Sequence, residues 1–179
     1  IYEFLTNKIY ISTDKIMKLP NPIDVKDIKE KSLKLLDITL PDKYILFIGR
    51  LSYVKNLFLL LDAFERGKLD DNYLVIVGDG EMKDALIEKT KKMNKVDKIM
   101  FLGEIENPLP ILKRSQLLVL PSFSEAYPTI LLEALCLYIP VLSTPTKGAK
   151  EILNNMAGTY ISNDYYNIEE FAKLMENGV

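Results

Sequence analysis

The sequence predicts an α/β protein with a doubly wound, mostly parallel six-stranded sheet of the Rossmann-like kind. From Lys43 onward, short apolar runs rich in β-branched residues alternate with segments of helical periodicity, as is typical of βαβ units on a parallel sheet. Glycines end the first two apolar runs and follow the third. The chain has 179 residues, of which 48% are apolar and 27% charged, values that suit one globular domain with a sizeable core.

The individual elements follow in chain order. Six strands are expected at Tyr44–Gly49, Tyr73–Gly78, Lys98–Leu102, Leu117–Leu120, Pro140–Ser143 and Gly158–Ile161. Helices are expected at Asn56–Glu65, Glu81–Met93, Pro108–Arg114, Pro128–Tyr138, Gly148–Leu153 and Asn167–Glu176. A sheet of this kind has its ligand crevice beyond the carboxyl ends of its strands.

The residues before Lys43 do not follow the repeat. We expect there a helix tail at Ile1–Lys8, a short strand at Ile16–Leu19, a rigid turn at Pro20–Pro22 and a charged helix from Val25 to about Asp37. Prolines on both sides of Asn21 indicate a hinge or linker. The expected division is therefore residues 1–24, the tail of a missing N-terminal domain with an interdomain linker, and residues 25–179, the Rossmann-like domain.

Composition excludes several classes of protein. The net charge is −2 and the basic residues are scattered, so no footprint for nucleic acid or for an anionic membrane is visible. The single cysteine, Cys136, excludes an internal disulfide and indicates a reducing compartment. No apolar run is long enough for a membrane span, and no signal peptide is visible. The expected location is the cytoplasm.

The chain contains no histidine. It therefore lacks the commonest general base and the commonest metal ligand, and one cysteine cannot build a zinc site or a Cys/His nucleophile. No Asp-x-Asp pair is present for a magnesium ion. Chemistry at this protein must therefore use carboxylates, cations and backbone dipoles, with no metal.

The stretch E-A-Y-P-T-I-L-L-E places Glu125 before a helix start and Glu133 inside the helix, with Pro128 at the first helical position. Helical side chains tilt toward the N-terminus, so both carboxylates can reach one site where free N–H groups also favour an anion. Such a site could hold a phosphate group and a polyhydroxylated ligand. The alternative, in which Glu125 caps the helix and Glu133 is solvated, is equally compatible with this motif alone.

The loop after the first strand reads G-R-L-S-Y-V-K-N, from Gly49 to Asn56. Asn56 suits a helix N-cap, which leaves Arg50 and Lys55 on the loop at the crevice. A guanidinium and an ammonium that converge there suit a diphosphate. Ordinary solvated cations are the alternative, and placement at the switch point of the sheet favours the diphosphate.

Three further loops end strands at the same edge. V-G-D-G-E, from Val77 to Glu81, needs its glycines for local turn geometry as readily as for phosphate, and the chain lacks the G-x-G-x-x-G dinucleotide pattern. L-G-E-I, from Leu102 to Ile105, can border a flat base or simply end its strand. K-G-A-K-E, from Lys147 to Glu151, has no assigned task.

Taken in order, these motifs resemble the C-terminal half of a GT-B glycosyltransferase of the large retaining family 4, also called glycosyltransferase group 1. The resemblance rests on N-P-I-D at Asn21–Asp24, on G-R-L with Lys55, on V-G-D-G, on F-L-G-E and on the E-x7-E pair. It extends from about Lys15 to the end of the chain.

The resemblance implies a retaining transfer of a sugar, of the hexosyltransferase type, from a UDP- or GDP-sugar to a cell-surface glycan or a lipid-linked saccharide. Arg50 and Lys55 would hold the diphosphate in place of a metal, Glu125 would contact the transferred sugar, and Glu133 would bind the ribose. The catalytic set would be Glu125, Arg50 and Lys55. The donor-binding set would be Gly49, Arg50, Lys55, Gly78, Gly103, Glu104, Ile105, Glu125, Ala126, Tyr127, Thr129, Ile130 and Glu133.

The missing half would bind the acceptor and make any peripheral contact with the inner face of the membrane, and nucleic acid is not an expected partner. Alternatives are a nucleotide-binding module without catalysis, a GT-B sugar-nucleotide epimerase, which would use histidines, and a flavodoxin-like signalling domain, which would need an acidic cluster. The sequence departs from the family pattern at Ala126 and Tyr138, where glycines are common, and at Lys147–Ala149, where a glycine pair is frequent.

Overall fold

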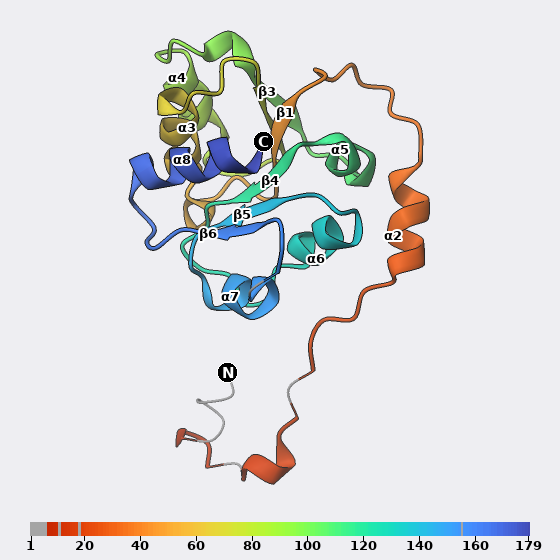
Figure 1. Cartoon of the computed structure of the whole chain (residues 1–179). Helices are drawn as coiled ribbons and strands as arrows, with labels where there is room; N and C mark the ends of the chain where they lie inside the picture. The colour runs from red at the N-terminus through yellow and green to blue at the C-terminus, as the bar shows by residue number, and fades with distance from the viewer. Residues whose placement is uncertain (1–6, 11, 18, 155) are drawn as a thin grey trace.

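The computed structural model describes residues 7–10, 12–17, 19–154 and 156–179. A single six-stranded sheet in the order β3-β2-β1-β4-β5-β6 forms the centre of the molecule (Figure 1). All neighbouring strands in it are parallel. The strands are β1 Tyr44–Ile48, β2 Tyr73–Val77, β3 Ile99–Gly103, β4 Leu117–Leu120, β5 Val141–Ser143 and β6 Thr159–Ile161. The predicted doubly wound α/β fold is confirmed.

The helices alternate with these strands as the sequence predicts, and their ends differ from the prediction by only a few residues. They are α2 Val25–Ser32, α3 Leu57–Arg66, α4 Lys83–Thr90, α5 Leu109–Arg114, α6 Thr129–Cys136, α7 Lys147–Leu153 and α8 Ile168–Gly178. The described residues also form the short 3-10 helices η1 Thr13–Lys15, η2 Tyr53–Lys55 and η3 Val96–Lys98.

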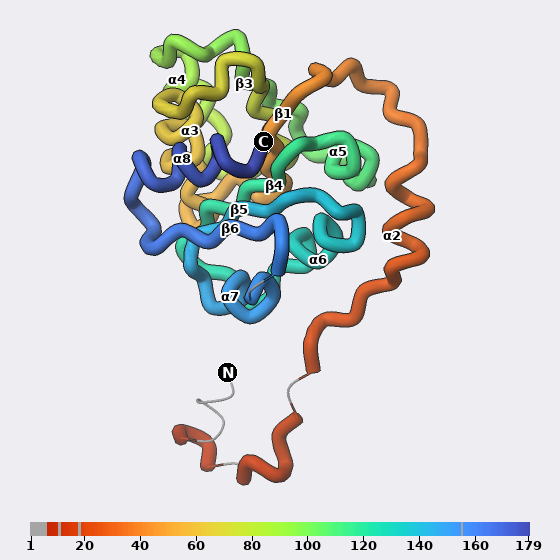
Figure 2. The backbone as a smooth tube through the Cα atoms, viewed as in Figure 1, coloured from red at the N-terminus to blue at the C-terminus, as the bar shows by residue number. Residues whose placement is uncertain are grey.

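The helices form two layers, one on each face of the sheet. Helix α3 packs against α8 and α4, whereas α6 packs against α5 and α7, and α2 lies over α5 and α6 (Figures 1 and 2). The chain runs outward from β1 to β3, returns to the centre through α5, and continues from β4 to β6. The direction of winding therefore reverses between β1 and β4, which is where such sheets bind ligands.

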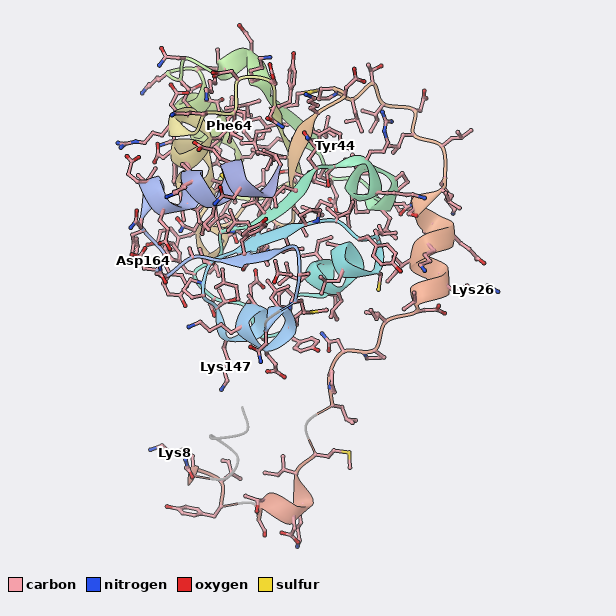
Figure 3. The ribbon with its side chains drawn as sticks, in the orientation of Figure 1. Lys8, Lys26, Tyr44, Phe64, Lys147 and Asp164 are labelled. Carbon is pink, nitrogen blue, oxygen red and sulfur yellow. The ribbon has the colours of Figure 1, made fainter. Side chains whose placement is uncertain are left out.

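The core lies on both faces of the central strands, because strands of a parallel sheet are covered on both sides. β1 and β4 are buried along almost their whole length. The hydroxyl of the fully buried Tyr44 donates to the carbonyl of Ile111 at 2.6 Å, and burial raises the pKa of Tyr44 to about 12. Figure 3 shows Tyr44 and Phe64 inside the body of the molecule. This packing fixes the frame from which the site loops emerge.

The described residues 7–10 and 12–17 lie apart from the body (Figure 2). Residues 1–6 of the expected helix tail lie outside the described residues. The expected strand at Ile16–Leu19 is wrong for its described residues, which form no strand. Their large side chains have no sheet to pair with, since Met17 is 80% and Leu19 76% exposed. The turn at Pro20–Pro22 leads into α2 without regular structure.

Helix α2 ends at Ser32, earlier than the predicted Asp37. Only Ile28 and Ser32 of this helix are buried, and Leu35 beyond it is fully exposed. Leu36 and Ile38 pack against the core from the irregular segment that follows the helix. Within the described part of the chain, no helix has the length and the apolar character needed to span a membrane.

Candidate functional site

Two loops meet where the winding of the sheet reverses. β1 and β4 are adjacent and parallel, so the loop after β1 and the loop after β4 leave the sheet at the same edge. The amide of Phe123 donates to the carbonyl of Val54 at 2.8 Å and ties the two loops together. Two adjoining hollows open on this rim, and both include Ile48 and Gly49 in their walls.

The first hollow, which we call the carboxylate hollow, has a volume of about 460 Å³. It brings together Lys55, Glu125 and Glu133, which the sequence predicts to share one site. Its walls are completed by Asn21, Ile48, Gly49, Pro108, Tyr127, Pro128, Thr129 and Ile130.

Lys55 and Glu125 form a short ion pair in this hollow. The Lys55 Nζ lies 2.5 Å from the Glu125 Oε1, and the two side chains are only 22% and 13% exposed. The hydroxyl of the buried Ser122 donates to the same oxygen at 2.7 Å. The contacts that hold this carboxylate therefore come from Lys55 and Ser122, which disfavours the alternative that Glu125 merely caps the helix.

Glu133 lies in the second turn of α6 and is half-buried. Burial raises the pKa of its carboxyl group, and the positive charge of Lys31 on α2 opposes that rise. A carboxylate that is partly withdrawn from water but still open to the hollow can accept hydrogen bonds from a hydroxyl-rich ligand.

The N-terminus of α6 opens into the same hollow. The residue before the helix is Pro128, whose side chain makes no capping hydrogen bond, and the first turn contains no acidic residue. Pro128 has an extended ψ of 109°, so it precedes the helix rather than occupying the predicted first helical position. Free N–H groups and the helix dipole favour an anion at this end.

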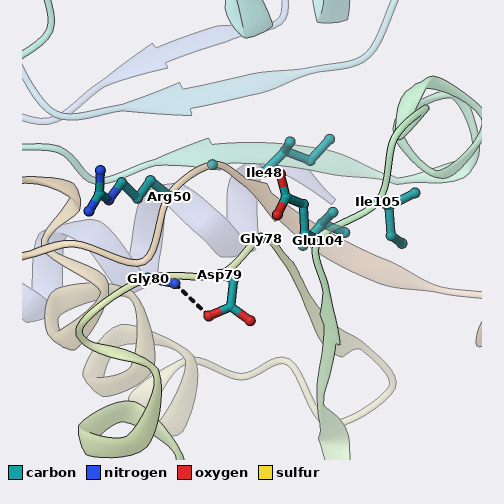
Figure 4. Close-up of a pocket in the computed structure, with 9 residues that line it drawn as sticks. Ile48, Arg50, Gly78, Asp79, Gly80, Glu104 and Ile105 are labelled. Carbon is teal, nitrogen blue, oxygen red and sulfur yellow. Dashed lines mark hydrogen bonds between the residues drawn. The ribbon is translucent and has the colours of Figure 1, made fainter.

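The second hollow, which we call the glycine hollow, has a volume of about 490 Å³ and lies between the ends of β1, β2 and β3 (Figure 4). Its lining residues are Ile48, Gly49, Arg50, Val77, Gly78, Asp79, Gly80, Glu104 and Ile105. Gly103 is not among these residues, but its carbonyl accepts a hydrogen bond at 2.7 Å from the amide of Gly78, which is one of them.

Arg50 and Lys55 do not converge as the sequence predicts. Arg50 lines the glycine hollow and Lys55 the carboxylate hollow. The Arg50 Nε lies 3.3 Å from Glu81, its side chain is 74% exposed, and it points away from Glu104 and Ile105 (Figure 4). Each cation therefore has its own carboxylate partner, because a loop that turns through a 3-10 helix points these two side chains in different directions.

The glycines of V-G-D-G let the loop after β2 pack closely against the loop after β1. Gly78 has a φ of 133°, and a Cβ added there would lie 2.0 Å from the carbonyl oxygen of Gly49. The amide of Leu51 donates to the carbonyl of Asp79 at 2.9 Å. The structure thus favours the local explanation of this motif over a phosphate-binding one.

Asn56 occupies the N-cap position that the sequence predicts, but its side chain does not cap the helix. Its backbone is left-handed, with φ 49° and ψ 41°, and its side chain makes no capping hydrogen bond. Its Nδ2 donates instead to the carbonyl of Tyr165 at 3.0 Å. The left-handed conformation, which asparagine tolerates, turns the side chain toward the loop after β6.

Gly148 is a site residue that the motif K-G-A-K-E did not reveal. A Cβ at this position would lie 2.7 Å from the carbonyl oxygen of Ala126, and its amide donates to the carbonyl of Glu125 at 3.1 Å. The side chain of Ala126 itself is exposed. Gly148 therefore lets α7 support the loop that carries Glu125.

Asn21 of the linker also reaches the site. It lines the carboxylate hollow, and its Nδ2 donates to the carbonyl of Tyr127 at 3.3 Å. The flanking prolines identified the linker, but no local signal placed it against α6. Among the described residues, no group of three or more histidine, cysteine, aspartate or glutamate side chains could hold a metal ion.

Comparisons with known proteins agree with this geometry. The chain is 36% identical over 154 residues to the N-acetylgalactosamine-N,N'-diacetylbacillosaminyl-diphospho-undecaprenol 4-alpha-N-acetylgalactosaminyltransferase of Campylobacter jejuni, covering 86% of this chain and 41% of the relative. It is 30% identical over 168 residues to the UDP-Gal:alpha-D-GlcNAc-diphosphoundecaprenol alpha-1,3-galactosyltransferase of Escherichia coli, covering 86% and 42%. The chain thus spans about two-fifths of the length of these relatives.

Solved structures show the same fold. A glycosyltransferase from Rickettsia africae superposes with a TM-score of 0.84 at 19% identity, covering 98% of this chain and 50% of the other. The Anabaena protein HepE in complex with UDP-glucose superposes with a TM-score of 0.70 at 20% identity, covering 76% and 38%. The family model described as glycosyl transferases group 1 matches residues 28–177. Because this match spans most of the chain, the protein belongs to the glycosyl transferases group 1 family.

Proposed function

We propose that this chain is the donor-binding half of a retaining glycosyltransferase that transfers a sugar from a nucleoside-diphosphate sugar to a saccharide acceptor. The observation that carries the proposal is the carboxylate hollow, where Lys55, Glu125 and Glu133 meet the N-terminus of α6 without a capping side chain. The hollow offers a cation and helix N–H groups to a diphosphate, and carboxylates to sugar and ribose hydroxyls.

The roles follow from the position of each group. Lys55 and the first N–H groups of α6, around Thr129 and Ile130, would bind the diphosphate and compensate the charge of the departing nucleotide. Glu133, deeper in the helix, would accept from the ribose hydroxyls. Glu125, in the loop, would contact the transferred sugar. These groups stand in for a metal ion, so donor binding is proposed to be metal-independent.

The glycine hollow adjoins the carboxylate hollow through Ile48 and Gly49, so one extended ligand can occupy both. Glu104 and Ile105 at the exit of β3 would border the base. Arg50 would reach the diphosphate only after leaving Glu81, and the long, exposed ion pair between them costs little to break.

The relatives' names support a saccharide acceptor carried on a lipid. Both bacterial relatives are named for acceptors built on diphospho-undecaprenol. We propose an acceptor of this class, a lipid-linked saccharide, held chiefly by the part of the enzyme that the relatives have and this chain does not span. A location at the inner face of the cytoplasmic membrane would follow.

Isothermal titration calorimetry of the chain with UDP and with GDP, each with EDTA and with added magnesium, tests the proposal. We expect one of the two nucleotides to bind equally well in both buffers. Lys55→Met should weaken that binding about tenfold, which corresponds to about 1.4 kcal/mol. Lys91→Met, which removes an exposed lysine paired with Glu88, should leave it unchanged. Strict dependence on magnesium would refute the metal-free site, and no binding of either nucleotide would refute the donor site.

A further inference from the structure

Four aromatic rings form a continuous surface beside the candidate site. Tyr53 lies in η2, Phe123 in the loop after β4, and Tyr165 and Tyr166 in the loop after β6. The ring centre of Phe123 lies 5.4 Å from that of Tyr53, 5.5 Å from that of Tyr166 and 6.3 Å from that of Tyr165. Phe123 therefore stands at the centre, and we call the four residues the aromatic platform.

The outer rings of this platform face water. Tyr53 is 69% exposed and Tyr166 74% exposed, and both are tilted against Phe123, by 36° and 42°. Isolated exposed aromatic residues need no explanation, but a contiguous group marks a binding surface.

The platform is held in place by hydrogen bonds that the proposed donor site does not need. The hydroxyl of Tyr165 donates to the carbonyl of Pro145 at 3.1 Å, and the carbonyl of Tyr165 accepts from the Nδ2 of Asn56 at 3.0 Å. The left-handed backbone of Asn56 is what aims this amide. Loops after three different strands are thus fixed against one another, so the rings lose little freedom when a ligand binds.

The platform and the Lys55–Glu125 pair are carried in part by the same two loops. Tyr53 precedes Lys55 by two residues and Phe123 precedes Glu125 by two residues, and the hydrogen bond from Phe123 to Val54 joins the two loops. A ligand on the platform would therefore be held by the loops that also carry Lys55 and Glu125. This position suits a part of the acceptor that extends beyond the sugar that reacts.

The surroundings of the rings identify the chemistry of the ligand. The same loops carry serine, asparagine and an aspartate, in the segments S-F-S-E and S-N-D-Y-Y-N, and Asp164 lies at the surface (Figure 3). Surfaces that insert into anionic membranes combine apolar side chains with lysine and arginine, which these two segments lack. The third loop, which carries Tyr53, contains Arg50 and Lys55, and these cations are paired with Glu81 and Glu125. Hydroxyl and amide groups around aromatic rings suit a neutral ligand with many hydroxyl groups.

We propose that the aromatic platform binds a pyranose ring of the saccharide acceptor, so that this half of the enzyme holds part of the acceptor as well as the donor. One face of a pyranose ring presents C–H bonds of slight positive charge, which match the negative face of an aromatic ring. The hydroxyls of Tyr53 and Tyr166, which are exposed, can bond the equatorial hydroxyls. The identification of the saccharide as an acceptor rests on the proposed function. The binding of a saccharide to the platform does not depend on it.

Amide-detected NMR titration of the chain with maltotriose and with N,N',N''-triacetylchitotriose, two neutral oligosaccharides, tests the proposal. We expect one of them to shift the amide signals of the platform and its neighbours. Tyr53→Ala and Tyr166→Ala should each weaken binding about three- to tenfold, the range expected for loss of one aromatic contact. Tyr138→Asn is the matched control, because Tyr138 is equally exposed, at 85%, and asparagine tolerates its left-handed backbone. It should bind as tightly as the unchanged chain.

Parallel titrations with UDP and with GDP separate the two proposals. One of these nucleotides should shift signals around Lys55 and Thr129 in all variants, so absence of binding by both would contradict the donor site and leave the platform standing. Absence of oligosaccharide shifts at the platform, with nucleotide binding intact, would overturn the platform proposal. So would shifts of the platform signals by phosphatidylcholine vesicles in place of oligosaccharides, or equal oligosaccharide affinity in the two platform variants and the unchanged chain.

Discussion

Replacing Glu125 by glutamine is expected to destabilise the chain and at the same time to tighten its binding of UDP. Glutamine has the same shape and can still accept from Lys55 and Ser122, so the substitution removes the charge and little else. A hydrogen bond to a charged group contributes about 1.5–3 kcal/mol and a neutral one about 0.5–1.5 kcal/mol. The substitution weakens two such hydrogen bonds, from Lys55 at 2.5 Å and from Ser122 at 2.7 Å. The side chains of Lys55 and Glu125 are largely buried.

The expected loss is therefore about 2 kcal/mol of unfolding free energy, which lowers the Tm of a chain of this size by about 4–8 °C. The same substitution is expected to raise the affinity for UDP. Without the carboxylate, the Lys55 ammonium is released to the diphosphate, and one negative charge beside that diphosphate disappears. We expect UDP to bind about three- to tenfold more tightly.

Thermal unfolding and calorimetry on the same preparations measure both effects. Glu88→Gln provides the matched control, because its ion pair with Lys91 is more than 60% exposed on both sides, and an exposed pair contributes about 1 kcal/mol or less. Lys55→Met should lower both stability and UDP affinity. If Glu125→Gln instead weakened UDP binding, Glu125 would not compete with the nucleotide for Lys55, and our account of the pair would be refuted.

Three further predictions concern other residues. Burial raises the pKa of Glu133 above the ordinary glutamate value of 4.5. Just above pH 4.5 the folded chain therefore binds more protons than the unfolded chain. The free energy of unfolding consequently falls as the pH rises through that window. Glu133→Gln should therefore unfold at a higher temperature than the unchanged chain at pH 7 and at the same temperature well below pH 4.5; equal Tm differences at both pH values would contradict this. In an active enzyme that contains this chain, steady-state kinetics should show that Glu125→Gln chiefly lowers kcat and Glu133→Gln chiefly raises KM for the donor, each by about 1.5–3 kcal/mol, whereas near-normal kinetics in both would contradict the assigned roles. Gly148→Ala should lower the Tm by about 4 °C or more, although alanine normally stabilises a helix by up to about 1 kcal/mol, and a rise in Tm would contradict the close contact with Ala126.

The sequence predicted the sheet well because its signals are local. A short run rich in β-branched and aromatic residues, such as Tyr44–Ile48, indicates a buried strand, and the alternation of such runs with helical segments indicates a parallel sheet. The positions of Glu125 and Glu133 were also predictable, because both lie within a few residues of one helix start. Their spacing alone decides that they can share a hollow with the N-terminus of α6.

Contacts between distant segments were less predictable. The pairing of Lys55 with Glu125 spans 70 residues and that of Arg50 with Glu81 spans 31, and no local pattern specifies which carboxylate each cation meets. The hydrogen bond of the Asn56 side chain is likewise not specified by the local sequence. As a residue just before a helix, Asn56 suits a cap, but a carbonyl 109 residues later offers its side chain a partner, and tertiary contacts override a local preference of about 1 kcal/mol.

Gly148 and Ala126 show how a departure from the family motif is accommodated. The sequence departs from the family pattern at Ala126, where glycine is common. In the structure the carbonyl of Ala126 faces Gly148 of α7, and Ala126 itself is exposed. The close backbone approach is made at Gly148, where a Cβ would lie within 3 Å of both Glu125 and Ala126. The strict requirement for glycine in this loop contact therefore lies on the supporting helix, and the position of Glu125 depends on Gly148 more than on the residue beside it.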